Sequence, residues 1–231
     1  MSIYTDAQSI IQQAIQACLP DQAVRRALED RTFGPGRVLL VSIGKAAWQM
    51  ASCAAALLGD RLDAGVVVTK HGHSQGEIPH CAICEGGHPV PDEGSFAGTR
   101  AAMELVRNLS PEDTVVFLVS GGGSALFECP LIPAEELEEL TRELLACGAD
   151  IVEMNTIRKR LSAVKGGRFA QLCAPAKVYA IVLSDILGDP LDMIASGPAY
   201  PDSSTCEQAR AIVEKYRLHL SPRAMELLGE E

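Results

Sequence analysis

The chain has 231 residues, is 47% hydrophobic and 22% charged, and carries a formal net charge of −10. This composition predicts a folded domain with a substantial apolar core, and the acidic balance argues against nucleic-acid binding, which needs a concentrated basic surface. No apolar run approaches the roughly 18 residues of a membrane span, and no signal-peptide pattern opens the chain, so we expect a cytoplasmic protein.

Hydrophobic periodicity predicts helices and strands that alternate along the chain. Helices are expected at 5–18, 21–29, 45–58, 95–109, 133–147, 150–161, 165–173 and 203–217. Strands are expected at 38–43, 65–69, 80–84, 115–119 and 178–183. This alternation predicts an α/β fold with three α/β/α layers around a mostly parallel, doubly wound, Rossmann-like sheet.

The loops that follow predicted strands are the expected ligand-binding segments, because such folds bind ligands at the carboxyl ends of their strands. These loops are 42–45, 69–73, 120–124 and 184–189. In the third, three glycines stand between two serines: Ser120, Gly121, Gly122, Gly123 and Ser124. Glycine lets the backbone approach a ligand closely, and a helix that begins near Ser124 would offer free N–H groups to an anion.

The glycine-rich loop matches neither of two common glycine motifs. It lacks the G-x-G-x-x-G fingerprint of dinucleotide binding, and Leu118 stands where a hydrolase G-x-S-x-G elbow needs glycine. A tight structural turn is the alternative to a ligand site. We favour ligand binding because three consecutive glycines lose much chain entropy on folding.

Lys45 follows the first predicted strand and opens the next helix. The segment is no P-loop, because Leu39 replaces the first glycine and Ala46 replaces the Ser or Thr that would bind the metal. A lysine is mildly unfavourable in the first turn of a helix. A bound anion therefore explains Lys45 better than a plain surface position does.

A basic cluster occurs between residues 155 and 168 of this acidic chain. Its members are Asn155, Arg158, Lys159, Lys165, Gly166, Gly167 and Arg168. The i, i+3, i+4 spacing puts the first three on one helix face, which suits a clamp for a carboxylate or phosphate. Salt bridges to the many glutamates are an equally weighted alternative.

Three aspartates, Asp185, Asp189 and Asp192, follow the last predicted strand. Hard oxygen ligands beside a phosphate site indicate Mg²⁺. Helix capping and turn formation are the alternative, because Gly188-Asp189-Pro190 is typical of a turn.

Eight scattered cysteines and no secretion signal predict that most of the thiols are small, buried and reduced. Cys81 and Cys84 form a single C-x-x-C near several histidines, and this is weak evidence for zinc, so we favour buried thiols. His88 lies in a rigid loop of glycines and prolines, 85–92, whose chemistry the residues alone do not specify.

Five motifs follow one another along the chain in a specific order. They are 41–46 (VSIGKA), 87–92 (GHPVPD), 120–125 (SGGGSA), Asn155-x-x-Arg158-Lys159 with 165–167, and Ser184-Asp185 with 195–198 (ASGP). Together they resemble the N-terminal domain of class II glycerate 2-kinases, the family that carries a C-terminal MOFRL domain. The resemblance covers about residues 5–217. It identifies 1–231 as the N-terminal glycerate-kinase domain, without the MOFRL domain.

The resemblance implies ATP-dependent phosphorylation of D-glycerate to 2-phosphoglycerate with Mg²⁺, in a cleft between two domains. A lysine matching Lys45 takes part in catalysis, and Asp185 or Asp189 would hold Mg²⁺ or receive the hydroxyl proton. Residues that would bind glycerate or phosphate are Ser120, Gly121, Gly122, Gly123, Ser124, Asn155, Arg158, Lys159, Lys165, Gly166, Arg168 and His88.

Members of this family are about twice as long as the chain, within the usual range for two domains. We therefore expect a fragment that lacks full kinase activity because half of the cleft is missing, and whose exposed apolar surface could support a homodimer. Two alternative functions remain open. One is a module that binds a sugar acid or phosphate without turnover, and the other is an NAD(P)H-dependent hydroxypyruvate reductase, a label that family members have also carried.

Overall fold

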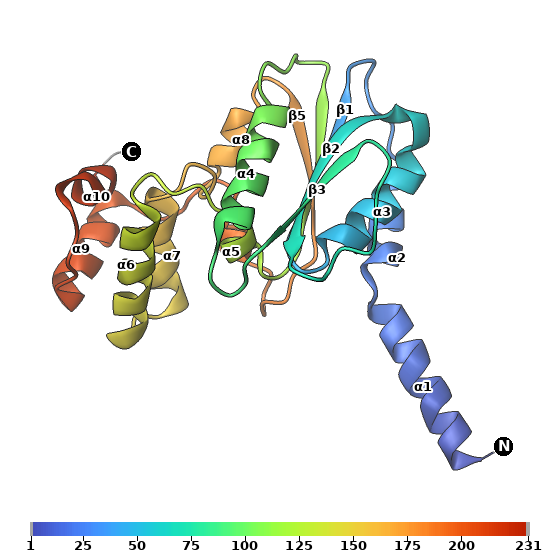
Figure 1. The fold of residues 1–231 in the computed structure, drawn as a ribbon, viewed down its shortest axis with the longest axis horizontal. Helices are drawn as coiled ribbons and strands as arrows, with labels where there is room; N and C mark the ends of the chain where they lie inside the picture. Colours follow the sequence, from blue (N-terminus) through green and yellow to red (C-terminus); the bar gives the residue numbers. More distant parts are fainter. Residues whose placement is uncertain (1, 230–231) are drawn as a thin grey trace.

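The computed structural model describes residues 2–229. These residues form one five-stranded sheet of order β3-β2-β1-β4-β5, in which every neighbouring pair of strands is parallel (Figure 1). The strands are β1 (Val38–Ile43), β2 (Leu62–Lys70), β3 (Cys81–Gly86), β4 (Thr114–Val119) and β5 (Lys177–Val182). The predicted α/β class and doubly wound parallel sheet are confirmed.

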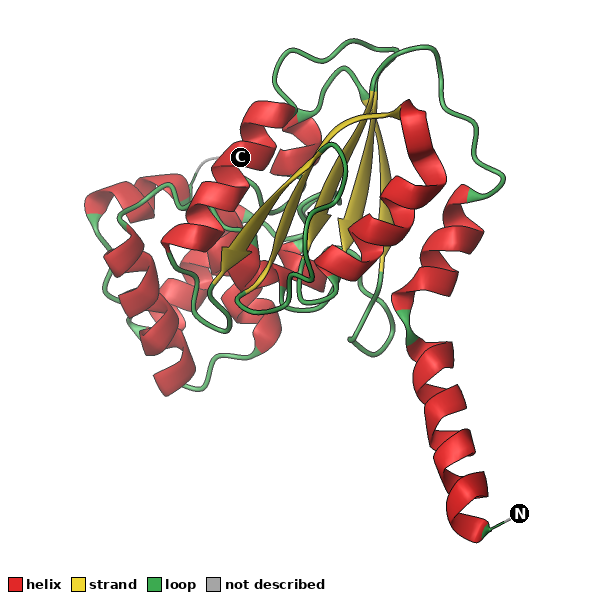
Figure 2. Cartoon of the chain, turned by 45° about the vertical axis from the view of Figure 1, so that its right-hand side comes forward, coloured by secondary structure: helices red, strands yellow, loops and turns green. Residues whose placement is uncertain are grey.

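Helices cover both faces of the sheet (Figure 2). The helices of the described residues are α1 (Ile3–Cys18), α2 (Pro20–Leu28), α3 (Ala47–Leu58), α4 (Glu93–Leu105), α5 (Gly123–Leu126), α6 (Ala134–Ala146), α7 (Ile151–Arg160), α8 (Arg168–Leu172), α9 (Cys206–Tyr216) and α10 (Pro222–Leu227), with 3₁₀ turns η1 (Gly59–Arg61) and η2 (Ile194–Ser196). The sequence analysis raises α5 only as a conditional helix near Ser124 and misses α10, because four and six residues are too short to show helical periodicity.

The central strands β1 and β4 are buried on both faces, which explains their continuous apolar sequences. Alternate residues along each strand enter two different cores. Leu40 and Leu118 face α2 and α3, whereas Val41 and Phe117 face α4, α5 and α8. Both cores are therefore closed by helices, as a doubly wound sheet requires.

Two parts of the chain lie beside this sandwich. Helices α6, α7, α9 and α10 pack around a third apolar core at one side of the sheet. Helix α1 projects away from the body in Figures 1 and 2, and none of its residues is buried. Within residues 2–229, no helix combines the length and apolar character that crossing a membrane requires.

Three phenylalanine rings, Phe117, Phe127 and Phe169, fill the core between β4, α5 and α8. Their centroids lie 4.9–6.0 Å apart, and all three side chains are fully buried. Phe127 caps the C-terminal end of α5, the short helix that follows the glycine-rich loop. The loop is thus anchored to the sheet by an aromatic contact.

We expect Phe127→Ala to lower the free energy of unfolding by about 3–5 kcal/mol, because the substitution leaves a cavity among fixed rings. Urea denaturation measures this loss. Leu145→Ala is the control, because Leu145 is exposed and its truncation should change stability by about 0.5 kcal/mol or less. A similarly small effect at Phe127 would contradict the anchoring role.

Candidate functional site

The loops after all five strands meet at the carboxyl edge of the sheet. The N–H of Lys45 donates to the carbonyl of Gly121 (2.9 Å), and the N–H of Ala46 donates to Ser120 Oγ (3.1 Å). Thr69 Oγ1 donates to the Gly44 carbonyl (3.2 Å). These bonds tie the loops after β1 and β4 to one another and to the end of β2.

The glycines at 121 and 122 are needed because other loops occupy the space of a side chain. A Cβ at Gly121 would lie 2.8 Å from Asp185 Cγ, well inside contact distance. A Cβ at Gly122 would lie 3.0 Å from His88 Cδ2 and 3.1 Å from Lys45 Cγ, and φ there is +87°. The structure therefore brings Lys45, His88 and Asp185 together around these two glycines.

Charged groups surround His88 at this edge. Partial burial lowers the pKa of His88, the Lys45 and Lys70 ammonium groups lower it further, and the Asp185 carboxylate opposes them. His73 Nδ1 donates to the Lys45 carbonyl (3.1 Å). The sequence analysis singles out the 69–73 loop but names neither Lys70 nor His73 as a site residue, although Lys70 ends a buried strand and His73 follows it.

The loop that carries His88 is fixed by Asp92, the N-cap of α4. The Asp92 carboxylate accepts hydrogen bonds from the N–H groups of Gly87 (2.9 Å) and Ser95 (3.0 Å), and it pairs with His71 Nε2 (2.6 Å). Burial by itself would raise the pKa of Asp92, but these hydrogen bonds outweigh it and lower the pKa to about 2. A carboxylate that stays ionised thus holds His88 over Gly122.

A polar network continues from Ser124 into the interior. Ser196 Oγ donates to Asn155 Oδ1 (2.9 Å), which leaves Ser124 Oγ to donate to Ser196 Oγ (3.0 Å). Arg158 Nη2 donates to the Ser124 carbonyl (3.2 Å). Ala195 and Ser196 have φ values of +53° and +63°, a left-handed backbone that side chains other than glycine's rarely adopt. Such strain is concentrated at functional sites.

The other predicted clamp cations have partners inside the protein. Lys165 Nζ pairs with Glu128 Oε2 (3.1 Å) and donates to the carbonyls of Ser124 and Phe127 (2.9 Å each). Lys159 Nζ pairs with Asp202 (3.2 Å) and Asp192 (3.5 Å). Burial lowers the pKa of Lys165 to about 8, although Glu128 opposes the shift.

Four of the predicted binding residues meet at a second place. Arg168 Nη1 donates to the Lys159 and Arg160 carbonyls at the end of α7 (3.0 and 3.2 Å). A polar cavity of about 360 Å³ is lined by Lys159, Lys165, Gly166 and Arg168, among others. Lys165 lies between this cavity and Ser124, so the predicted basic cluster is divided between two neighbouring regions.

The three aspartates after β5 do not converge. Asp185 lies against Gly121, Asp189 occupies an exposed turn with φ +49°, and Asp192 turns toward Lys159 and Ser203. Across residues 2–229, no group of three or more His, Cys, Asp or Glu could hold a metal ion. A magnesium ion at this edge would therefore need oxygen ligands from phosphate and water in addition to Asp185.

The eight cysteines are all free, and fewer are buried than predicted. Cys53, Cys173 and Cys206 are buried, whereas Cys18 and Cys147 are exposed. Cys81 and Cys84 lie three residues apart on β3, so their side chains point to opposite faces of the sheet. Burial raises the pKa of both thiols, that of Cys81 to about 11. This pair therefore cannot ligate one zinc ion.

Comparison with known proteins gives consistent matches over nearly the whole chain. The model of a family described as "Domain of unknown function (DUF4147)" matches residues 6–229. A D-glycerate 2-kinase of Thermotoga maritima is 52% identical over 227 residues, which are 97% of this chain and 54% of that protein. A putative hydroxypyruvate reductase of Agrobacterium vitis is 43% identical over 84% of the chain and 51% of its own length.

A solved structure supports the same relationship. The crystal structure of glycerate kinase from Thermotoga maritima superposes with a TM-score of 0.90 at 52% identity, over 96% of this chain and 54% of that one. The chain thus spans about half the length of the relatives that it matches.

We expect His88 to titrate below the ordinary histidine value of about 6.5. Lys45→Ala should raise the pKa of His88 because a neighbouring cation is removed, and Asp185→Asn should lower it because a neighbouring anion is removed. NMR titration of the histidine ring signals measures both shifts. Shifts of the same sign in the two variants would contradict the arrangement around Gly122.

We expect Lys165→Met to lower the free energy of unfolding by about 3–5 kcal/mol, because the buried Glu128 would lose its nearer cation and keep only Arg158 at 3.8 Å. The double variant, Glu128→Gln with Lys165→Met, should lose less free energy of unfolding than the sum of the losses in the two single variants. Chemical denaturation of the four proteins measures this coupling. Additive losses would indicate that the two groups do not stabilise one another.

Proposed function

The chain belongs to the DUF4147 family, the N-terminal domain of glycerate 2-kinases, and on that premise we propose that it forms the nucleotide- and glycerate-binding half of an ATP-dependent glycerate 2-kinase. The proposed reaction transfers a phosphoryl group from ATP to the 2-hydroxyl of D-glycerate. The observation that carries the proposal is the 52% identity to a D-glycerate 2-kinase over 97% of the chain.

The glycine-rich loop and Lys45 suit the handling of phosphates. Phosphoryl transfer depends on positioning and charge neutralisation more than on covalent chemistry by the protein. In the proposed site the backbone from Ser120 to Ser124 cradles phosphate oxygens, and the exposed Lys45 ammonium neutralises negative charge on the transferring group. The contact of the Lys45 stem with Gly122 supports this pairing of roles.

His88 and Asp185 pack against neighbouring glycines of the same loop and suit the glycerate hydroxyl. His88, whose lowered pKa favours the neutral ring, is proposed to bind the substrate, and Asp185 to accept the hydroxyl proton or to hold Mg²⁺. Bound Mg²⁺ would supply charge neutralisation between phosphate groups. The sequence predicts Asp189 as a second oxygen ligand, but it lies in an exposed turn that does not converge with Asp185, so its proposed role has less support.

The basic residues are proposed to bind the glycerate carboxylate or nucleotide phosphates, with different support for each. Arg158 is the best supported, because it is partly exposed and reaches the Ser124 carbonyl. Ser124 and Asn155 share its hydrogen-bond network through Ser196. The proposed roles of Lys159, Lys165, Gly166 and Arg168 have less support, because their described contacts are with the protein itself.

The hydroxypyruvate reductase function is less favoured. The 43% identical relative carries that name as a putative one. The glycine-rich loop of this chain lacks the dinucleotide fingerprint, which a reductase using NAD(P)H would be expected to carry.

Isothermal titration of the chain with ATP tests the proposal. We expect Lys45→Ala to weaken ATP binding at least tenfold, about 1.4 kcal/mol, because a charge-assisted contact with phosphate is lost. Lys177→Ala is the matched control, because Lys177 is also exposed but begins β5 at the opposite edge of the sheet. In a full-length kinase that contains this chain, the same Lys45 substitution should reduce turnover by orders of magnitude.

Two outcomes would contradict this proposal. Equal ATP affinity of the parent chain and the Lys45→Ala variant would show that Lys45 does not bind the phosphates. Oxidation of NAD(P)H in the presence of hydroxypyruvate, without phosphorylation of glycerate, would favour the reductase instead.

A further inference from the structure

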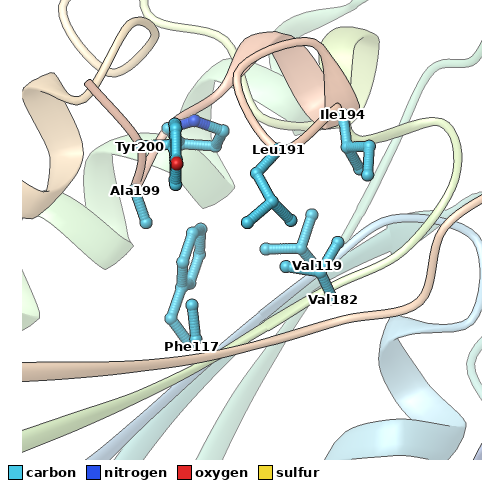
Figure 3. Close-up of a pocket in the computed structure, with 9 residues that line it drawn as sticks. Phe117, Val119, Val182, Leu191, Ile194, Ala199 and Tyr200 are labelled. Atoms are coloured by element: carbon cyan, nitrogen blue, oxygen red, sulfur yellow. The ribbon is translucent and has the colours of Figure 1, made fainter. Parts of the chain in front are cut away.

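An apolar cavity of about 280 Å³ lies on the sheet next to the candidate site. Figure 3 shows Phe117, Val119 and Val182 rising from β4 and β5 to form its floor. Leu191 and Tyr200, from the segment that joins β5 to α9, form its walls. The cavity therefore lies on the face of the sheet that carries the aromatic core.

The cavity and the glycine-rich loop share two segments of chain. Val119 lines the cavity and directly precedes Ser120, and Ile194 lines it and directly precedes Ala195. Ala195 packs on Gly123, where an added Cβ would lie 2.6 Å from the Ala195 Cβ. Val119 and Gly122 are three residues apart, so at most about 10 Å of backbone separates the cavity from the loop.

The cavity's size and lining select the kind of group that it can hold. Its volume lies just under the range of about 300–1,000 Å³ that whole small-molecule sites occupy, so it suits a single ring system. Among the nine described residues that line it, only Tyr200 has a polar side-chain atom. Glycerate, which carries a carboxylate and two hydroxyls, would lose its hydration there without compensation.

A ligand that fits both the apolar cavity and the glycine-rich loop has a flat apolar ring at one end and negative charge at the other. Tyr200 is 47% exposed, so its ring offers a face on which a base can stack. We propose that this cavity seats the base of a nucleoside triphosphate, whose phosphates extend past Val119 to the glycine-rich loop and Lys45. This inference rests on the proposed kinase function and adds a location for the nucleotide.

Filling the cavity tests the inference. Ala199, a partly buried lining residue, is replaced by tryptophan, and Ala211→Trp on the exposed surface of α9 is the matched control. Each protein is titrated calorimetrically with ATP and with inorganic tripolyphosphate, which has the phosphates but no base. Ala199→Trp should weaken ATP binding about tenfold or more, because base stacking is lost, and leave tripolyphosphate affinity within about twofold. Ala211→Trp should change neither affinity.

A second variant removes the stacking surface without filling the space. Tyr200→Ala alters a half-exposed side chain, so this variant should fold even if the Ala199→Trp variant does not. We expect weaker ATP binding, by about fivefold or more, and unchanged tripolyphosphate binding.

The outcomes separate this inference from the function on which it rests. If the parent chain and both variants bind ATP equally, the base lies elsewhere and the inference is wrong, while the kinase function stands. If the folded variants lose affinity for ATP and for tripolyphosphate by the same factor, the substitutions affect the phosphate site alone and the inference is also wrong. If the parent chain binds neither compound, the inference and the proposed nucleotide-binding role both fail.

Discussion

The candidate site depends on one steric constraint, which is that the backbone from Ser120 to Gly123 lies in contact with three other loops. The Gly121 carbonyl accepts a hydrogen bond from Lys45, and the Asp185 carboxylate packs against the same residue. His88 and Ala195 pack against the next two glycines. A side chain at Gly121 or Gly122 would push these groups apart, so the absence of side chains allows four segments to share one site.

Beneath this loop, buried polar groups pair with residues from distant parts of the chain. Lys165 and Glu128 are both fully buried, and the same lysine donates to the Ser124 carbonyl. Buried ion pairs add little net stability because both charges must be desolvated. Their value here is positional, because the ammonium holds the backbone of α5, and α5 begins where the glycine-rich loop ends.

Much of the fold could be predicted from local sequence, because buried strands and amphipathic helices have periodicities that a short window reveals. The first residues of the helices were less predictable where contacts with distant parts of the chain set the backbone conformation. The helix expected from residue 45 begins at Ala47, because Gly44 has a φ of +109° and Ala46, the N-cap, has non-helical angles. The helix expected over 165–173 begins only at Arg168, because Gly166 and Gly167 have positive φ values.

The sequence by itself determined the class of fold, the strand-end loops and the family, because these follow from residue types at fixed spacing. Only the tertiary structure decided which side chains face a shared space. Asp185 and Asp192 look equivalent in sequence, yet Asp185 packs against Gly121 of the glycine-rich loop and Asp192 pairs with Lys159. The physical reason is that partners such as Glu128 and Lys165 are 37 positions apart in the chain, and no local pattern encodes which charges will meet when the sheet brings them together.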